Sequence, residues 1–454
     1  MLIDKKTDFD TAVWDFDEVD HGLSVREAIA EARRCLNCPK PLCRSGCPIE
    51  NEIPRFIQAL AQGNIGEASA IIARRSSLPA VCGRVCPHEK QCEAHCILTK
   101  RGCGVRIGKL ERFIADFAAE MGVTAPPDAQ PYKGRVAVVG SGPAGLTVAG
   151  DLAKQGFSVT IFEGQTEAGG VLMYGIPAFR LSREVVKREI EKITNLGVEI
   201  HTGVLVGPDI TVDELFSQGY DAIFIGTGTA LPKTLDVPGK DLPGVIQATY
   251  LLSMASFATN GEFDRREVPV AHGDRVAVIG AGNVAMDAAR TALRLGARSV
   301  TVVYRRTQQE MTALQSEYDQ AAAEGVEFLW LASPVAFEGE DRLKALAYEI
   351  MELNDGKAVA SGQHASLPVD KIILAIGQRP AARIVSTTTG IDVNSSGYVI
   401  TKDRPYGMTT RKGVFAGGDV VHEPATVVLA MKEAKRVAAG IAMYVEAKRL
   451  MEDC

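Results

Sequence analysis

A strand, a glycine turn, a helix and a second strand follow one another in this order twice along the chain. The first copy reads RVAVVGSGPAGLTVAGDLAKQGFSVTIFE, and the second reads RVAVIGAGNVAMDAARTALRLGARSVTVVYRR. The first glycines of the two copies, Gly140 and Gly280, are 140 residues apart. Because such a unit builds the nucleotide-binding half of a parallel α/β sheet, we expect two dinucleotide-binding domains.

The first copy carries the full glycine pattern, Gly140-x-Gly142-x-x-Gly145, directly after the apolar strand VAVV. These glycines allow a tight turn, a close approach of the backbone to a pyrophosphate, and close packing of helix on strand. Glu163 ends the next strand, twenty-three residues after Gly140, at the place where an acid binds ribose hydroxyls. The alternative is a glycine turn that binds no ligand.

The second copy differs at two places that bear on cofactor choice. Its glycine pattern is Gly280-x-Gly282-x-x-Ala285, in which alanine is a tolerated variant. Its second strand ends at Arg305 and Arg306, with no acid. An acid there would repel a 2′-phosphate, whereas arginines bind it, so this site is predicted to prefer NADP(H) over NAD(H). The alternative is that both arginines lie on a solvated surface.

The residues before the first copy, 1–130, show helical spacing of apolar residues and no strand-like alternation. In VRIGKLERFIADFAAEMG, for example, Leu110, Phe113 and Ile114 fall on one helix face, and Gly122 ends the pattern. The proline-rich segment VTAPPDAQPYKG, residues 123–134, then predicts a linker. A helical domain is therefore expected to precede the two α/β domains.

Nine of the ten cysteines lie between Cys35 and Cys103, which favours metal binding or redox chemistry over a disulfide scaffold. They include two sets, Cys35-x2-Cys38-x4-Cys43-x3-Cys47-Pro and Cys82-x3-Cys86-x5-Cys92-x3-Cys96. A run of four cysteines ending in Cys-Pro is typical of bacterial ferredoxins, in which the fourth cysteine binds the other of two clusters. Zinc, which usually takes paired C-x2-C knuckles, and unligated thiols are the alternatives.

Other observations exclude several function classes. The chain has a net charge of −6 and no basic block, so we expect no nucleic-acid partner. It has no run of 18 apolar residues and no secretory signal, so we expect a cytoplasmic protein without a membrane span. No cysteine occurs between Gly104 and Asp453, so the α/β half has no redox C-x2-C pair. None of the seven histidines needs a catalytic role, and no catalytic acid or base is predicted.

A series of motifs along the chain resembles that of the flavoprotein reductases that have two dinucleotide domains. These are the two glycine turns, the strands DAIFIGTGT and KIILAIGQRP, and the late segment GVFAGGDV with the helix that follows it. The resemblance implies that FAD binds at the first glycine turn, with Gly170, Asp419 and Thr426 as further contacts. In that family Asp419 would bind the ribityl or phosphate side of the flavin, and the helix near Thr426 would point at its pyrimidine edge. The NADPH domain would be inserted within the FAD domain.

The cysteine-rich segment, residues 35–103, and the helix after it make the resemblance more specific. CGRVCPHEKQCEAHC and IGKLERFIADF are similar to segments of the small (β) subunit family of NADPH-dependent glutamate synthase. Related proteins are the N-terminal part of dihydropyrimidine dehydrogenase and the NADPH-binding subunit of a bifurcating NADH-dependent ferredoxin:NADP oxidoreductase. The implied fold is α/β, with a helical double [4Fe–4S] domain at 1–130, an FAD domain at 131–250 and 378–454, and an NADPH domain at 251–377.

The family also implies how the ligands divide between the two clusters. One [4Fe–4S] cluster would take Cys35, Cys38, Cys43 and Cys96. The other would take Cys47, Cys86, Cys92 and an oxygen donor, which corresponds to Glu111 in this sequence. The alternative for Glu111 is an ordinary residue on a helix surface. Cys82, Cys103 and Cys454 are then surplus and are interpreted as structural or incidental thiols.

The resemblance implies an electron-input subunit that oxidises NADPH through FAD and two clusters and passes electrons to a catalytic partner subunit. Glutamate synthase is the leading assignment. A pyrimidine-reducing partner and a bifurcating transhydrogenase, for which ferredoxin is a partner, share every motif. The alternative outside the enzymes is a structural or binding module that holds FAD but transfers no electrons. The identity of the partner, the direction of electron flow, the cluster potentials and the oligomeric state do not follow from the sequence.

Overall fold

The computed structural model describes residues 14–122, 130–381 and 383–452, and its internal contacts divide the chain into two compact units. The insert unit contains residues 174–179 and 232–377 with the described residues before 19, and the main unit contains the rest. The chain therefore leaves the main unit and returns to it after residue 377. Most of the predicted linker at 123–134 lies outside the described residues.

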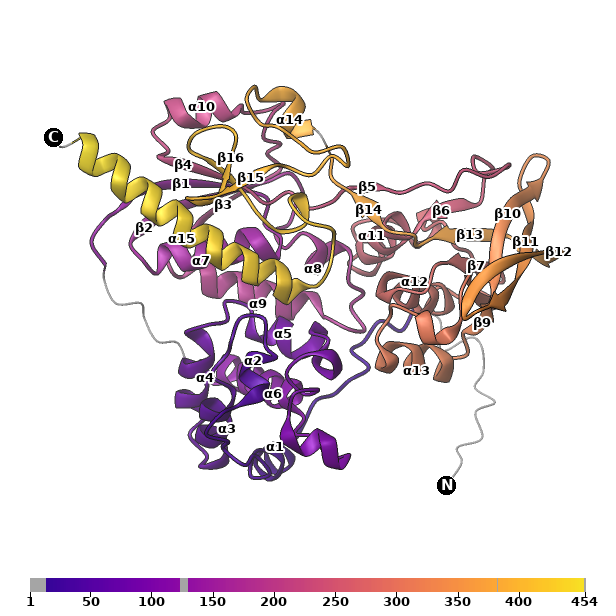
Figure 1. Cartoon of the computed structure of the whole chain (residues 1–454), viewed down its shortest axis with the longest axis horizontal. Helices are drawn as coiled ribbons and strands as arrows, with labels where there is room; N and C mark the ends of the chain where they lie inside the picture. Colours follow the sequence, from indigo (N-terminus) through magenta and orange to yellow (C-terminus); the bar gives the residue numbers. More distant parts are fainter. Residues whose placement is uncertain (1–13, 123–129, 382, 453–454) are drawn as a thin grey trace. The chain divides into compact units, whose positions relative to one another are not determined.

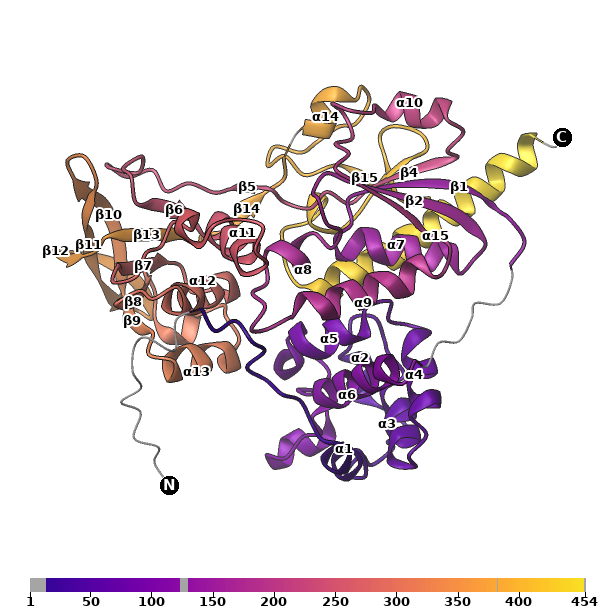
Figure 2. The same cartoon turned by 180° about the vertical axis from the view of Figure 1, so that it is seen from behind.

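The main unit begins with a bundle of short helices, drawn in indigo and purple in Figures 1 and 2. They are α1 (Val25–Ala32), α2 (Leu42–Ser45), α3 (Ile53–Ala61), α4 (Ile65–Ala73), α5 (Pro79–Val85) and α6 (Ile107–Glu120), with the 3₁₀ turns η1 (His88–Lys90) and η2 (Ile97–Arg101). Ser24 and Glu27 form a capping box that starts α1. Phe56, Leu110 and Ile114 belong to the buried core of the bundle. As predicted, the described residues up to 122 contain helices and turns but no strand.

The rest of the main unit is built on a seven-stranded sheet in the order β15-β16-β17-β4-β1-β2-β3. The strands are β1 (Gly134–Val139), β2 (Phe157–Glu163), β3 (Glu199–Thr202), β4 (Ala222–Ile225), β15 (Thr401–Asp403), β16 (Tyr406–Thr409) and β17 (Val414–Ala416). The strands from β17 to β3 are parallel, and β15 and β16 extend the β17 edge in antiparallel pairing. The helices are α7 (Pro143–Ala153), α8 (Val171–Tyr174), α9 (Arg183–Thr194), α10 (Val212–Ser217), α14 (Arg383–Thr387), η5 (Gly418–Val420) and α15 (Val427–Glu452).

The insert unit has its own five-stranded parallel sheet in the order β6-β13-β7-β8-β9. The strands are β6 (Val245–Gln247), β7 (Arg275–Ile279), β8 (Ser299–Tyr304), β9 (Glu327–Trp330) and β13 (Lys371–Leu374). The helices are α11 (Ala248–Thr259), η3 (Arg265–Glu267), α12 (Asn283–Arg294), η4 (Gln308–Glu310) and α13 (Gln315–Ala323). An antiparallel sheet of β10 (Ala332–Gly339), β11 (Leu343–Asn354) and β12 (Lys357–Pro368) follows β9, and β5 (Leu231–Pro232) pairs with β14 (Gln378–Arg379).

Within the main unit, the helical bundle packs directly on the helices of the large sheet. The carboxylate of Glu189 on α9 is fully buried and accepts a hydrogen bond of 3.0 Å from the backbone N–H of Ala80 at the start of α5. Lys154 donates to the backbone carbonyl of Ala73, and Ser77 donates to Asp151. A capped helix start and polar contacts of this kind hold the bundle in a defined position on the sheet.

The predicted fold class is confirmed in its architecture. A helical region precedes two α/β sheets, one largely and one wholly parallel, and the second sheet is formed by residues inserted between β4 and β15 of the first. The predicted domain boundaries after residues 130, 250 and 377 stay predictions.

Candidate functional site

The first glycine turn joins β1 to α7 in the main unit. Gly140 has a φ of 95°, which favours glycine. A Cβ at Gly145 would lie 1.9 Å from the carbonyl oxygen of Gly140, so this position accepts only glycine. Gly142 precedes α7, whose start has no side-chain cap. The turn therefore presents free backbone N–H groups at a helix N-terminus, which suits a phosphate.

Glu163 lies beside this turn, at the end of β2, as its sequence position predicts. Its carboxylate accepts a hydrogen bond of 2.9 Å from the backbone N–H of Ser141 and another from the Ser141 hydroxyl. Glu163 is buried, and its second oxygen accepts from the N–H of Gln165 at 2.9 Å. These bonds fix the carboxylate next to the glycine turn. Sequence reasoning missed Ser141, which lies at a variable position within the glycine pattern.

Two other parts of the predicted site, Gly170 and the segment containing Asp419, also come to the first glycine turn. A Cβ on Gly170 would lie 2.9 Å from Cα of Gly142, so the two backbones touch. A Cβ on Gly418 would lie 2.9 Å from that of Ala144 in α7, which brings the segment containing Asp419 to the same place. Burial raises the pKa of Asp419. Thr426 starts α15, where its hydroxyl accepts a hydrogen bond from the N–H of Leu429.

The second glycine turn joins β7 to α12 in the insert unit. Gly280 has a φ of 122°, and a Cβ there would lie 2.5 Å from the carbonyl oxygen of Ala375. Gly282 precedes α12, again without a side-chain cap. Ala285 is fully buried, so the fold accommodates its methyl group at the position where the first turn demands glycine.

Arg305 and Arg306 directly follow β8, and both are exposed. Nε of Arg306 lies 3.9 Å from one carboxylate oxygen of Glu310, and the other oxygen accepts a hydrogen bond from the N–H of Thr307. Arg306 is thus partly engaged by an acid on its own turn. Both side chains lie at the carboxyl end of the parallel sheet, where nucleotide ligands bind in such folds.

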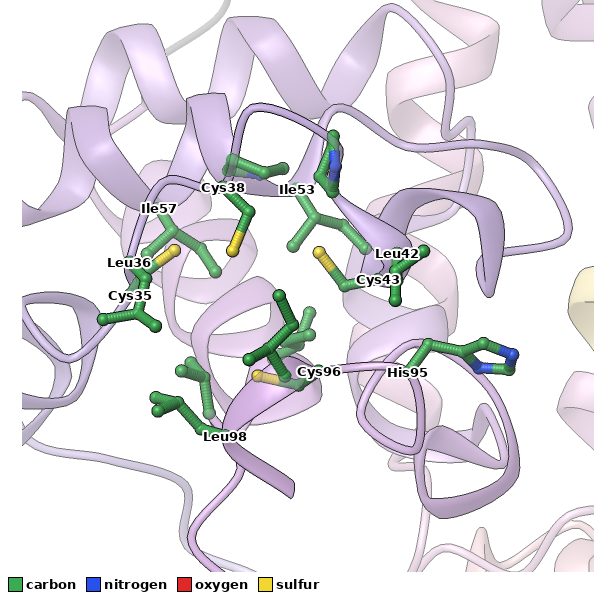
Figure 3. Close-up of a pocket in the computed structure, with 15 residues that line it drawn as sticks. Cys35, Leu36, Cys38, Leu42, Cys43, Ile53, Ile57, His95, Cys96 and Leu98 are labelled. Carbon is green, nitrogen blue, oxygen red and sulfur yellow. The ribbon is translucent and has the colours of Figure 1, made fainter. Parts of the chain in front are cut away.

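The first cysteine recess is formed by two separate segments of the helical bundle. Figure 3 shows the sulfur atoms of Cys35, Cys38, Cys43 and Cys96 directed into one recess, which has about 420 Å³ of empty space. Apolar side chains complete the wall, among them Leu42, Ile53, Ile57 and Leu98. Figure 3 also shows His95 at the edge, turned away from the sulfur atoms.

Burial changes the acid–base behaviour of these thiols. It raises the pKa of Cys35, and it raises that of Cys43 to about 11. At neutral pH these groups are therefore protonated until a positively charged centre binds, and binding then releases the protons.

The second recess brings together residues from the bundle and from α15. It has about 320 Å³ of empty space, and Cys47, Cys82, Cys86, His88, Cys92, Glu111 and Val428 are among the residues that line it. Burial raises the pKa of Cys47 to about 12. The side-chain hydrogen bond with Cys82, together with burial, raises the pKa of Cys86 well above its usual value.

Glu111 is buried on α6, with 8% of its surface exposed, so its interpretation as a surface residue is wrong. Burial raises the pKa of its carboxyl group to about 8. One carboxyl oxygen accepts a hydrogen bond of 3.3 Å from Nδ2 of Asn51. The carboxyl group faces the same recess as Cys47, Cys86 and Cys92.

Two residues in the second recess were not predicted to be part of it. Cys82 was interpreted as surplus, yet it is buried and its thiol contacts that of Cys86 one helical turn along α5. The spacing of four residues between them is the signal that could have placed it there. His88 also lines the recess, and its Nε2 atom is buried without a hydrogen-bond partner among the described residues. Burial lowers the pKa of His88 to about 4.

The donor sets fit iron–sulfur clusters. The first recess offers four thiols, and the second offers thiols with a carboxyl group, around space that no side chain fills. Thiolates are the usual ligands of iron–sulfur clusters. Among the described residues, no group of three His, Cys, Asp or Glu side chains is arranged to hold a single metal ion. Cys103 is exposed and lines neither recess, and Cys454 lies outside the described residues.

Sequence patterns of two protein families match almost the whole chain. The family described as dihydropyrimidine dehydrogenase domain II, 4Fe–4S cluster, matches residues 12–123. The family described as pyridine nucleotide-disulphide oxidoreductase matches residues 134–434. No helix in the described part of the chain is long and apolar enough to cross a membrane.

Similar proteins are known at the level of whole chains. The small chain of NADPH glutamate synthase from Halomonas elongata is 37% identical over 442 residues, which cover 95% of this chain and 93% of that one. The NADPH-Fe(3+) oxidoreductase subunit beta of Geobacter sulfurreducens is 34% identical, over 89% of this chain and 63% of its own. The structure of FprA from Mycobacterium tuberculosis (His-to-Gln mutant) shares the fold, with a TM-score of 0.59 and 20% identity over 72% of this chain and 87% of that one.

Proposed function

Since the chain belongs to the glutamate synthase small-chain family and is an NADPH-dependent FAD and iron–sulfur oxidoreductase, we propose that it is a cytoplasmic electron-input subunit of a larger enzyme. Family membership confirms the predicted cofactor types, which are NADPH, FAD and [4Fe–4S] clusters. The partner and the ligand assignments below are our proposals.

The position of the second recess is the main support for this proposal. Its wall includes thiols of the helical bundle and Val428 near the start of α15. The first turns of the same helix also lie near the first glycine turn, because a Cβ on Gly418 would lie 2.9 Å from that of Ala144 in α7 and 3.9 Å from that of Ala430 in α15. The proposed cluster site and the proposed flavin site therefore share one structural element. A module that holds FAD without transferring electrons would not need this arrangement.

We assign the FAD site to the residues gathered at the first glycine turn. The turn itself binds the pyrophosphate through backbone N–H groups, and Glu163 binds ribose hydroxyls. Asp419 and Thr426 approach from the segment before α15. Further contacts come from the backbone at Gly140, Gly142, Gly145 and Gly170.

We assign NADPH to the second turn, at Gly280, Gly282 and Ala285. Arg305 and Arg306 bind the 2′-phosphate by charge-assisted hydrogen bonds. Because Arg306 also lies near Glu310, Arg305 is expected to make the larger contribution.

We assign the clusters to the two recesses. The first cluster takes Cys35, Cys38, Cys43 and Cys96, and the second takes Cys47, Cys86, Cys92 and Glu111. Cys82 belongs to the wall of the second recess as a neighbour of a ligand. Cys47 follows the first three cysteines closely in the chain, so one segment, residues 35–47, would hold both clusters near each other.

When bound, the flavin exchanges hydride with NADPH and single electrons with the clusters, which carry one electron at a time. The chain's own residues bind these groups, orient them and exclude water from them. No side chain is needed as a general acid or base.

The leading partner is the large chain of a glutamate synthase, because the relative from Halomonas elongata is named as the small chain of that enzyme and matches over most of both chains. The relative from Geobacter sulfurreducens is a subunit of a different NADPH-oxidising enzyme. The cofactor motifs therefore do not identify the partner. The surface of this chain determines which partner binds, and the neighbouring genes would identify it.

The test is anaerobic addition of NADPH to purified protein. Flavin absorbance should bleach, and electron paramagnetic resonance should detect reduced clusters in a protein with about eight irons, the sum of two four-iron clusters. Zinc in place of iron, about four irons, or flavin that stays oxidised would each refute the proposal. Purification of the native complex should then recover the large chain.

A further inference from the structure

We propose that the rim of the first cysteine recess is the docking face for a redox protein that carries acidic side chains around an apolar centre. The docking face consists of residues 33–44 and 96–101. This inference rests on the proposed function, because it identifies where electrons leave the subunit and what kind of surface receives them.

The centre of the docking face is apolar and exposed. Leu36, Leu42 and Ile97 line the first recess and keep 58%, 47% and 40% of their surfaces exposed. Figure 3 shows Leu36 next to Cys35 and Leu42 next to Cys43 at this recess. Three large apolar side chains grouped at one recess on the surface are typical of a protein contact.

The two segments that form the docking face carry charge of one sign. Residues 33–46 and 94–106 contain seven lysines and arginines and no aspartate or glutamate, although the whole chain has a net charge of −6. Two of the seven have a structural role, since Arg34 and Arg106 both form ion pairs with buried Glu31. Of the others, Arg33, Lys40, Lys100 and Arg101 are exposed.

The basic residues belong to the two segments that hold the first cluster site. Lys40 lies between Cys38 and Cys43, and Lys100 and Arg101 end the 3₁₀ turn that begins at Ile97. Positive charge is therefore concentrated in the two segments that carry the exposed apolar side chains. A partner with an acidic rim would be steered to this face and away from the rest of an acidic molecule.

The two recesses differ in a way that makes the first one the exit. Val428 of α15 forms part of the second recess, so that site lies against the half of the main unit that holds the proposed flavin site. The residues that line the first recess all come from the helical bundle. A partner on the docking face would thus meet the cluster farther along the route from the flavin.

The test uses a plant-type [2Fe–2S] ferredoxin as an acidic probe. Its affinity for the anaerobic holoenzyme is measured by calorimetry at low and high salt, with both proteins oxidised. The rate of NADPH formation from two reduced ferredoxins, NADP⁺ and one proton is measured in parallel. Tight binding at low salt that weakens steeply with added salt is expected.

Charge and apolar variants locate the contact. Lys40→Glu with Lys100→Glu should weaken ferredoxin binding about tenfold or more at low salt, whereas Lys344→Glu with Lys357→Glu, at exposed positions in the insert unit, should not. Leu36→Ala should weaken binding at both salt concentrations, and Leu353→Ala, which is 54% exposed elsewhere, should have no effect. Equal effects of test and control variants, or no binding by the unmodified protein, would overturn the docking face.

Two further measurements distinguish a failure of the docking face from a failure of the proposed function and from self-association of the chain. Bleaching of the flavin by NADPH should be unchanged in the double variant of Lys40 and Lys100 and in both control variants. If the unmodified protein does not bleach, the proposed function fails; if it bleaches and the variants bind ferredoxin normally, only the docking face fails. Sedimentation at several concentrations tests whether a second copy of the chain occupies the face, and a dimer that Leu36→Ala dissociates would overturn the assignment to a redox partner.

Discussion

The thiol sulfur of Cys82 on α5 lies 3.5 Å from the thioether sulfur of Met431 on α15. Cys82 lines the second recess, and α15 is the helix that starts beside the first glycine turn. The contact therefore joins the helical bundle to α15, the last helix of the large-sheet part of the main unit, through two sulfur-containing side chains. It also explains why a cysteine that binds no cluster in our assignment is buried beside one.

We expect Cys82→Ser to retain both clusters and Cys47→Ser to lose one. The reason is that Cys47 is an assigned ligand, whereas Cys82 is assigned to the wall. Iron analysis of anaerobic protein should give about eight irons for the first variant and about four for the second, as four-iron clusters require. If Cys82→Ser loses iron instead, Cys82 is a ligand and the assignment of Glu111 fails.

Glu111→Gln should keep the second cluster, because an amide oxygen can replace the carboxylate as a donor. Glu111→Leu should lose that cluster and leave the first one in place. Electron paramagnetic resonance of the reduced protein distinguishes the two clusters, and iron analysis counts them. Glu120→Leu, at the exposed end of the same helix, is the control. A Glu111→Leu protein with both clusters intact would show that the carboxylate is not a ligand.

Replacing Arg305 and Arg306 with Gln should raise KM for NADPH about tenfold or more, because hydrogen bonds to charged groups contribute about 1.5–3 kcal/mol each. KM for NADH should change little. Arg305→Gln alone should have the larger single effect, since Arg306 also lies near Glu310. Steady-state reduction of an artificial acceptor provides both constants, with exposed Arg298→Gln as the control. Equal changes for the two nucleotides would remove the 2′-phosphate role.

Glu324→Ala should destabilise the insert unit by about 3–5 kcal/mol, because it leaves a buried charge without its main partner. The guanidinium of Arg290 is fully buried and donates two hydrogen bonds to Glu324, at 2.7 and 3.0 Å. Both tryptophans of the chain, Trp14 and Trp330, belong to this unit, so their fluorescence during urea unfolding reports on it. Glu327→Ala, at an exposed position, should be nearly neutral.

The same pair predicts a pH dependence. Burial opposes ionisation of Glu324, but the hydrogen bonds and charges of Arg294 and Arg290 outweigh it and lower the pKa below its ordinary value of 4.5. The stabilisation is therefore fully present above pH 4.5 and is lost as the pH falls below that value. In Glu324→Ala this part of the acid sensitivity should disappear.

The glycine turns show what could be predicted from local sequence. A turn between a strand and a helix depends on the few residues within it, so the glycine pattern was sufficient to predict the positions of Gly140 and Gly280. Even so, only the structure shows why the third position differs between the copies. At Gly145 a Cβ would meet the carbonyl oxygen of Gly140 at 1.9 Å, whereas the methyl group of Ala285 is buried without such a clash.

The cysteine sites show the limit of that reasoning. Spacing alone indicated clusters but left zinc open, and the resemblance rather than the spacing suggested that Cys96 joins Cys35 and its neighbours. The folded chain brings them to one recess. It also places Cys82 and His88 in the second recess, where neither was predicted to lie.

By itself, then, the sequence determined the order of the elements, the two nucleotide turns and the presence of a cysteine-rich helical domain. Each of these depends on residues that are neighbours in the chain, so periodicity and spacing record them. The tertiary structure alone decided that Glu111 is buried and that Val428 closes the second recess. Both depend on the packing of segments that lie far apart in the sequence, and hydrophobic burial, which drives that packing, has no fixed spacing along the chain.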